Sequence, residues 1–91
     1  MDMVKVRFTA NLARHIETPA AEVAGSTVRE ALESVFRSNP MLRGYILDDQ
    51  SAVRQHVMVF VDGEQVADRT GLSDAVPPGA EIFVMQALSG G

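Results

Sequence analysis

Residues 81–91 read EIFVMQALSGG, an apolar stretch that continues directly into a short tail of small residues. We expect its first part to form a strand and residues 87–91 to form a flexible tail. Glycine has no Cβ, so Gly90 and Gly91 can enter a narrow slot in which a larger residue would clash. We therefore expect the carboxylate of Gly91 to be the reactive group, and the rest of the chain to present it.

The composition indicates one folded domain, residues 1–91, in which 46% of the residues are hydrophobic and 22% are charged. There is no cysteine, which excludes disulfides and thiol chemistry by the chain itself. The net charge of −4 argues against a nucleic-acid partner and favours a protein partner with a basic surface. Residues 1–9 lack the apolar run of a signal peptide, and no segment approaches the ~18 apolar residues of a membrane span. We expect a cytoplasmic protein with no membrane partner.

The N-terminal part predicts two strands. Val4, Val6 and Phe8 alternate with polar residues, which is the period of a strand with one buried face. Residues 10–16 are polar enough for a turn, and residues 17–24 are expected to return as a second strand. Pro19 weakens that strand and is expected at a sheet edge or at the start of the strand.

One main helix is predicted, and it begins after Thr27. Thr27 and Glu30 have the spacing of a capping box, in which each side chain binds a free backbone N–H of the first turn. The apolar stripe of this helix is formed by Val28, Ala31, Leu32, Val35 and Phe36. Glu33 and Arg37 are spaced for an ion pair on the other side, and Asn39-Pro40 is expected to end the helix.

The second half of the chain predicts three more strands. Residues 41–55 form a connection without a clear period. Its side chains expected to tuck under the core are Leu42, Tyr45, Ile46 and Leu47. The remaining elements are expected to be a strand at 56–61, a hairpin turn at Asp62-Gly63, a strand at 64–67, a helical turn at 72–76, a bend at Pro77-Pro78-Gly79 and the last strand. This order indicates an α+β fold, with a mixed sheet of four to five strands and one main helix packed on one face.

One helix can cover only one face of the sheet, so the other face must be covered by another segment or be exposed. The strand at 56–61 and the last strand are apolar in both phases of the alternation. If the valines and Ile82 face the helix, the side chains that face away are Met58, Phe60, Phe83 and Met85. Residues 41–55 could cover them. Alternatively they form a docking patch ringed by Lys5, Arg7 and Thr9, which we favour because such patches are enriched in aromatic residues and methionine.

The chemistry of a terminal carboxylate requires help from another protein. The group is ionised and unreactive at neutral pH, and activation as an acyl adenylate is the most plausible route. The chain has no glycine-rich phosphate-binding loop. We therefore expect no cofactor on the chain itself, and ATP to be used by an activating partner.

Four segments, together with the terminal glycines, carry a resemblance that covers nearly the whole chain. They are VKVRF at 4–8, GSTVREAL at 25–32, VFVDGE at 59–64 and PGAEI at 78–82. The chain resembles the MoaD/ThiS family of ubiquitin-like sulfur carriers. This resemblance implies a β-grasp fold whose first and last strands are parallel and central. It also implies adenylation of Gly91 by an E1-like adenylyltransferase (MoeB/ThiF-like) and conversion to a thiocarboxylate with sulfur from a donor protein.

The resemblance further implies a partner-binding surface and an acceptor for the sulfur. The side chains implied in partner binding are Phe60, Phe83, Met85, Met58, Arg7 and Leu88. The acceptor is expected to be an enzyme such as a molybdopterin synthase large subunit, with thiamine and cysteine formation as alternatives. Two departures from the family pattern, the long connection 41–55 and Ala87-Leu88 in place of a proline-containing approach, leave the pathway open.

Other candidate sites are weaker. His15 and His56 lack a cysteine or carboxylate companion, Asp48-Asp49 is typical of a solvated turn, and Lys5 is an unfavourable isopeptide acceptor within a strand. We therefore expect the chain not to be an enzyme by itself. Two other functions stay open, a ubiquitin-like modifier conjugated through Gly91 and a non-catalytic β-grasp interaction module.

Overall fold

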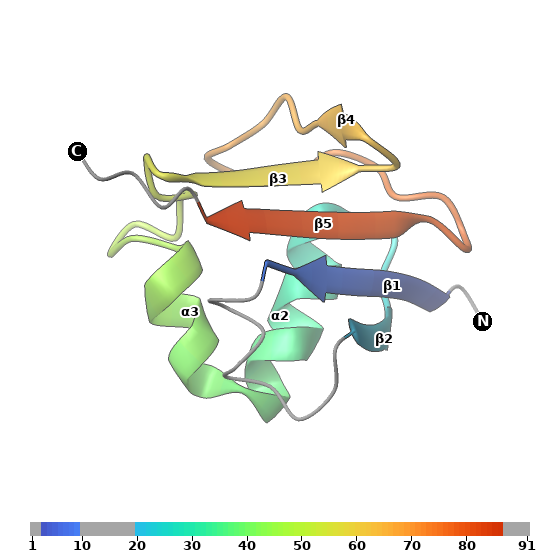
Figure 1. Cartoon of the computed structure of the whole chain (residues 1–91), viewed down its shortest axis with the longest axis horizontal. Coiled ribbons are helices and arrows are strands. Elements are labelled where there is room, and N and C mark those ends of the chain that lie inside the picture. Colours follow the sequence, from blue (N-terminus) through green and yellow to red (C-terminus); the bar gives the residue numbers. More distant parts are fainter. Residues whose placement is uncertain (1–2, 10–19, 87–91) are drawn as a thin grey trace.

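The computed structural model describes residues 3–9 and 20–86, which form one five-stranded mixed sheet and two helices (Figure 1). The elements are β1 (Met3–Phe8), β2 (Ala20–Ala24), α2 (Val28–Ser38), α3 (Pro40–Ile46), β3 (Val57–Val61), β4 (Glu64–Gln65) and β5 (Glu81–Gln86). The strand order is β2-β1-β5-β3-β4, in which β1 and β5 are parallel and the other pairs antiparallel. The predicted α+β fold with the first and last strands side by side in the sheet is confirmed.

Helix α2 forms as the sequence predicts, with one change in its cap. The Thr27 hydroxyl accepts from the Glu30 backbone N–H at 3.2 Å. The Glu30 carboxylate accepts from the N–H of Ser26 at 2.8 Å, whereas in a capping box it would accept from the N–H of Thr27, the N-cap residue. All five residues of the predicted apolar stripe are buried. Glu33 pairs with Arg29 and Arg43, so the predicted pair of Glu33 with Arg37 is wrong.

The core lies between the helices and one face of the sheet, which we call the inner face. The inner-face side chains that are buried are Val4, Val6, Phe8, Val57, Val59, Ile82 and Val84. They join one cluster with the stripe of α2. Each side chain of this size stabilises the fold by about 1.5–3 kcal/mol when it leaves water. Val61, also expected to face the helix, is only partly buried against this cluster.

The connection 41–55 contains a second helix that the sequence analysis missed. Helix α3 has Pro40 at its start and Gly44 within it, so its seven residues carry little helix propensity. Leu42, Ile46 and Leu47 are buried in the inner-face core, as expected. Tyr45 is 39% exposed, so its predicted burial is wrong. Because this segment packs into the same core as α2, it does not act as a cover for the other face of the sheet.

The turns confirm two predictions and overturn one. Asp62 and Gly63 both have positive φ, 48° and 87°, as the predicted hairpin turn requires. Gly79, with φ of 80°, lies in a turn closed by the Ala80 N–H and the Pro77 carbonyl at 3.0 Å. Residues 72–76 are not helical, so that prediction is wrong. β4 ends at Gln65, two residues earlier than predicted.

The predicted strand at 17–24 is present as β2, at an edge of the sheet. The turn predicted at 10–16 and the position of Pro19 fall outside the described residues.

Candidate functional site

The face of the sheet turned away from the helices, the outer face, carries the predicted patch. Side chains alternate between faces along a strand, so the buried valines of β3 and β5 direct their neighbours outward. Phe60 is opposite Phe83, and Met58 is opposite Met85, across the antiparallel pair β3–β5. Arg7 of β1 is opposite Phe83 on its other side. The register therefore brings together five of the six predicted partner-binding residues.

The outer face is only partly open to solvent. Its four apolar side chains are partly exposed, whereas Arg7 is exposed. At such positions, paired aromatic and methionine side chains on neighbouring strands bury part of their surface against each other. The rest of each side chain stays accessible to a partner. The outer face thus has the amphipathic character of a protein-docking surface, and it lies on three adjacent strands.

A polar rim borders these side chains on the β1 side. Arg7 lies 3.6 Å from Glu81, and both side chains are about half exposed, so this pair adds little stability. Lys5 is opposite Glu22 in β2 and Glu81 in β5. The sequence analysis did not name Glu81 as a member of this face. Its even spacing from Phe83 and Met85 along the same strand is the signal that could have found it.

Thr9 makes a hydrogen bond that the sequence did not predict. Its hydroxyl accepts a hydrogen bond from the backbone N–H of Gln86 at 3.3 Å, at the end of β5. Gln86 is the last described residue, and residues 87–91 follow it in the sequence. The predictions for Leu88, Gly90 and Gly91 lie outside the described residues.

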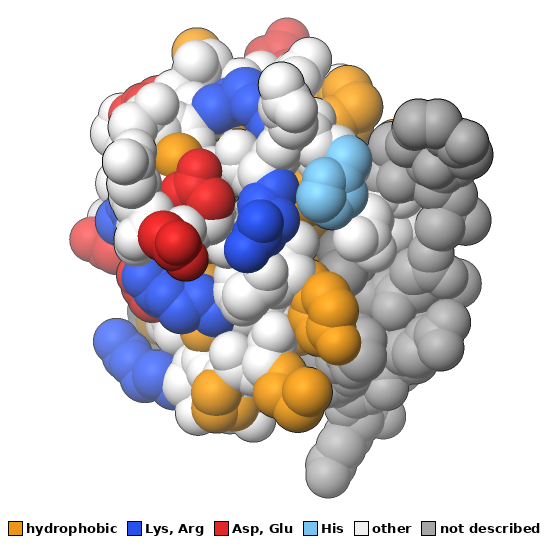
Figure 2. Space-filling model, turned by 90° about the vertical axis from the view of Figure 1, so that its left-hand side faces the viewer, with side chains coloured by type: hydrophobic (Ala, Val, Ile, Leu, Met, Phe, Trp, Pro, Cys, Tyr) orange, Lys and Arg blue, Asp and Glu red, His pale blue; other side chains and the backbone are white. Residues whose placement is uncertain are grey.

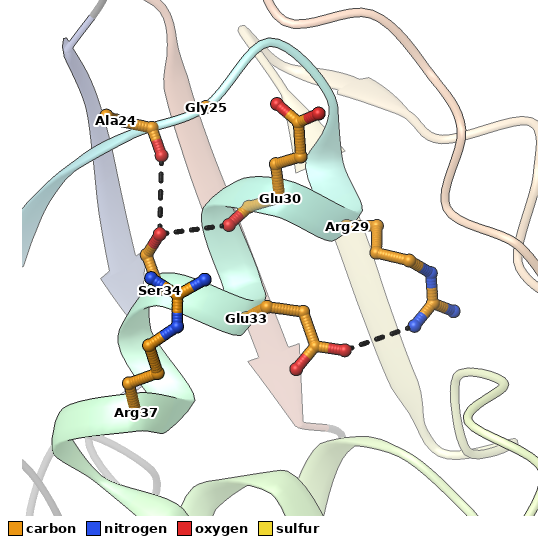
Figure 3. Close-up of a pocket in the computed structure, with 7 residues that line it drawn as sticks. All are labelled: Ala24, Gly25, Arg29, Glu30, Glu33, Ser34 and Arg37. Carbon is orange, nitrogen blue, oxygen red and sulfur yellow. Dashed lines mark hydrogen bonds and ion pairs between the residues drawn. The ribbon is translucent and has the colours of Figure 1, made fainter.

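A hollow of about 470 Å³ lies over the solvent side of α2 and the end of β2 (Figure 3). Three of its polar side chains, those of Arg29, Glu33 and Ser34, bind groups that also line it. Arg29 contacts Glu33 at 3.4 Å, and the Ser34 hydroxyl lies 3.1 Å from the Glu30 carbonyl and 3.4 Å from the Ala24 carbonyl. These internal contacts indicate a structural surface and not a reactive site.

The carboxylates with altered pKa values lie at the start of α2 and in the loop between β4 and β5, outside the outer face. The Ser73 hydroxyl and the backbone N–H groups of Gly71 and Ser73 lower the pKa of Asp68 to about 2. The backbone N–H and then the hydroxyl of Ser26 lower the pKa of Glu30, and the backbone N–H groups of Ala67 and Asp68 lower that of Asp74. Each carboxylate completes the hydrogen bonds of a nearby turn.

The other predicted candidates stay isolated. His56 is exposed just before β3, and Asp48 binds the N–H groups of its own turn, at Gln50 and Ala52. His15 falls outside the described residues. Within residues 3–9 and 20–86, no three histidine or acidic side chains lie close enough together to hold a metal ion. In the same part of the chain, neither helix has the length and hydrophobicity to cross a bilayer.

Arginine side chains hold the loops at the end of the molecule toward which β1 and β5 run. Arg54 donates to the Gly44 carbonyl at 2.8 Å, and Arg69 donates to the carbonyls of Arg54 and Val57 at 2.7 and 2.8 Å. Viewed from this end, positive and negative side chains are intermixed and the hydrophobic ones form small separate areas (Figure 2). The arginines on this end therefore serve the loops, and they do not build a uniformly basic surface.

The fold is a ubiquitin-like β-grasp, with a partly exposed apolar face on its central strands. A comparison with protein-family models matches the ThiS family over residues 6–91, and the chain belongs to this family. A comparison with curated protein sequences found no match.

Solved structures with the same fold include small archaeal modifier proteins and a complex that contains CysO. SAMP1 from Haloferax volcanii is 25% identical, with a TM-score of 0.84 and coverage of 98% of this chain and 99% of that chain. The small archaeal modifier protein 1 from Methanosarcina acetivorans is 27% identical, with a TM-score of 0.82 and coverage of 100% and 98%. The BexX/CysO complex of Amycolatopsis orientalis contains a chain that is 24% identical, with a TM-score of 0.84 and coverage of 97% and 99%. At that identity, the last likeness concerns the fold alone.

Proposed function

We propose that this ThiS-family protein is a sulfur carrier that is activated at the carboxylate of Gly91. The observation that carries the proposal is the position of β5. This strand contributes Phe83 and Met85 to the outer face, and the tail 87–91 follows it directly in the sequence. A partner docked on the outer face would therefore be close to the start of the tail. The family match, which extends to residue 91, supports the same assignment.

The proposed chemistry has two steps. An E1-like enzyme transfers AMP from ATP to the Gly91 carboxylate and releases pyrophosphate. In the second step, the outer sulfur of a persulfide on a donor protein attacks the acyl carbon and displaces AMP, and a thiol then attacks the donor sulfur of the resulting acyl disulfide, which releases the thiocarboxylate and leaves a disulfide on the donor. Docking through the outer face makes each step effectively intramolecular, and such proximity lowers the barrier substantially.

We further propose that the acceptor resembles a molybdopterin synthase large subunit. In that arrangement the tail enters the acceptor's active site and supplies the sulfur there. Acceptors of thiamine-type and cysteine-type pathways are the alternatives. Incubation of the thiocarboxylate form with each acceptor enzyme and its substrate separates them, because only the correct acceptor returns the carrier to the carboxylate mass.

The intact mass of the protein tests the carrier function. Before the reaction, the mass shows whether Gly91 carries a free carboxylate. After incubation with ATP, a sulfur donor and the E1-like enzyme, we expect a gain equal to sulfur minus oxygen. The matched control lacks Gly91 and is expected to show no gain. An unchanged mass of the wild-type protein would contradict the proposal and leave a non-catalytic interaction module.

A second candidate is a protein modifier joined to target lysines through Gly91. The likeness to two structures named small archaeal modifier protein 1, at 25% and 27% identity, favours it. This function predicts high-mass adducts on denaturing gels that disappear when Gly91 is deleted. A carrier without modifier activity forms the thiocarboxylate and no such adducts.

A further inference from the structure

The ends of β1 and β5 are connected by a side chain where the sheet ladder stops. Phe8 is in register with Val84, and the Thr9 N–H donates to the Val84 carbonyl at 3.1 Å. The next N–H of β5 that points toward β1 belongs to Gln86. It donates to the Thr9 hydroxyl at 3.3 Å, a side-chain acceptor in place of a backbone carbonyl.

Gln86 depends on this contact because its backbone N–H faces β1. Backbone groups alternate between the two edges of a strand. The Ala80 and Val84 carbonyls accept from β1 and from Thr9, whereas the Glu81 carbonyl accepts from Asp62, on the β3 side. Gln86 shares the orientation of Val84. The Thr9 hydroxyl is therefore the last hydrogen-bond acceptor that the sheet offers to β5 before residue 87.

We infer that Thr9 is a positioning residue for the C-terminal tail. This inference rests on the proposed function. Five residues span at most about 16–18 Å when fully extended, so the direction in which the chain leaves Gln86 decides where the Gly91 carboxylate can go. The hydrogen bond to Thr9 restrains the backbone of Gln86, the residue from which the chain continues to Gly91.

The contact sets an upper limit on the effect. Thr9 can bias the tail by no more than the net free energy of its hydrogen bond, which corresponds to about a two- to tenfold change in a rate or an equilibrium. The outer-face side chains do not take part in this bond. Thr9→Val leaves the four apolar side chains of the outer face in place, so we expect its main effect on the activation step.

Two substitutions separate the hydroxyl from the shape of the side chain. Thr9→Val keeps the branched shape and removes the hydroxyl, whereas Thr9→Ser keeps the hydroxyl. In amide hydrogen exchange of the protein alone, we expect Thr9→Val to raise the exchange rate of Gln86 about two- to tenfold. The amides of Ile82 and Val84 are expected to keep their rates, and Thr9→Ser is expected to match the wild type. An unchanged Gln86 rate in Thr9→Val, or an equal rise at Ile82, would overturn the inference.

The activation step provides a second readout. With the E1-like enzyme and ATP, we expect Thr9→Val to lower kcat for adenylate formation about two- to tenfold while KM for the carrier is unchanged. Thr9→Ser is expected to restore kcat, and equal kcat values for wild type and Thr9→Val would overturn the inference. A wild-type protein that forms no adenylate would instead contradict the proposed function, and the exchange rates would still decide whether Thr9 holds the end of β5.

Discussion

At the scale of single residues, Arg29 connects α2 to two loops. Its Nε donates to the Gly71 carbonyl at 2.8 Å, and its Nη2 donates to the carbonyls of Ser51 and Thr70 at 2.9 and 3.2 Å. Arginine suits this site because its planar guanidinium offers donors in several fixed directions at once, whereas lysine has one compact charged group.

We therefore expect Arg29→Lys to destabilise the protein by about 1–2 kcal/mol, because lysine cannot keep all three hydrogen bonds to backbone carbonyls. The control is Arg37→Lys, an exposed position two turns further along the same helix, where we expect a change within about 0.5 kcal/mol. Urea unfolding measures both. Similar midpoints for the two variants would show that the Arg29 contacts contribute little.

Asp68 connects stability to pH. Its carboxylate accepts from the N–H groups of Thr70, Gly71 and Ser73 and from the Ser73 hydroxyl, and its pKa falls from an ordinary value near 3.8 to about 2. A carboxyl group whose pKa is lower in the folded state contributes stability above the unfolded pKa. That contribution is lost as the pH falls through the folded value.

Asp68→Asn is therefore expected to be less stable than the wild type at pH 6, because its amide cannot accept all four bonds. The difference in Tm between the two proteins should shrink as the pH is lowered from about 4 toward 2. Thermal unfolding followed by circular dichroism at several pH values measures this trend. A difference that stays constant with pH would contradict the assigned role of the charge.

At the scale of elements, the close approach of β2 to α2 depends on Gly25. A Cβ at this position would lie 2.8 Å from the backbone nitrogen of Ala31, closer than Cβ atoms in proteins come to other heavy atoms. The two elements meet across this contact because glycine leaves the space empty.

Gly25→Ala is expected to cost about 1–3 kcal/mol, since the helix backbone would have to shift. Gly44→Ala is the matched control, because a Cβ there meets nothing within 4 Å. Gly44 lies within α3, so that substitution should stabilise by up to about 1 kcal/mol. Urea midpoints are expected to move in opposite directions, and a tolerated Gly25→Ala would disprove the packing constraint.

The elements that could be predicted are those whose signal lies within one segment. The stripe of α2, the alternation of β1 and the Asp62-Gly63 turn are local and were correctly predicted. Helix α3 was missed because it is short and contains Gly44, so its stability comes from the burial of Leu42 and Ile46. The helical prediction for residues 72–76 was wrong because the side chains of Asp68 and Asp74 bind the backbone of this loop and hold it in an irregular form. Such contacts leave no periodic pattern in the sequence, so they could not be predicted from it.

At the scale of the whole molecule, the two faces of the sheet differ in burial: the inner face packs into the core, and the outer face is partly open to solvent. Val84 is fully buried on the inner face, whereas Phe83 is partly exposed on the outer face, one position earlier in the same strand. The alternation of β5 was enough to separate these roles. The pairing of Phe60 with Phe83 and the neighbouring Arg7 required the strand register, which a single sequence does not contain.

A charged substitution is therefore expected to reduce activation on the outer face and to unfold the protein on the inner face. Phe83→Glu is expected to stay folded and to lower kcat/KM for activation about 30-fold or more, as for the loss of a docking hot spot. Val84→Glu is expected to unfold because it buries an unpaired charge. Met41→Glu, at an exposed apolar residue on α3, is the control that should retain activity. Circular dichroism reports the fold, and adenylate formation reports activation. Unfolding of Phe83→Glu would assign that side chain to the core.

The position of β5 also determines when during synthesis the outer face exists. β5 pairs with both β1 and β3, which do not pair with each other, so without it the described strands form two separate hairpins, β1–β2 and β3–β4. β5 is also the last of these strands to be made by the ribosome. Contacts between such distant segments form late and slowly. The outer face of the sheet is therefore complete only when β5, the strand that precedes residues 87–91, has been translated and inserted.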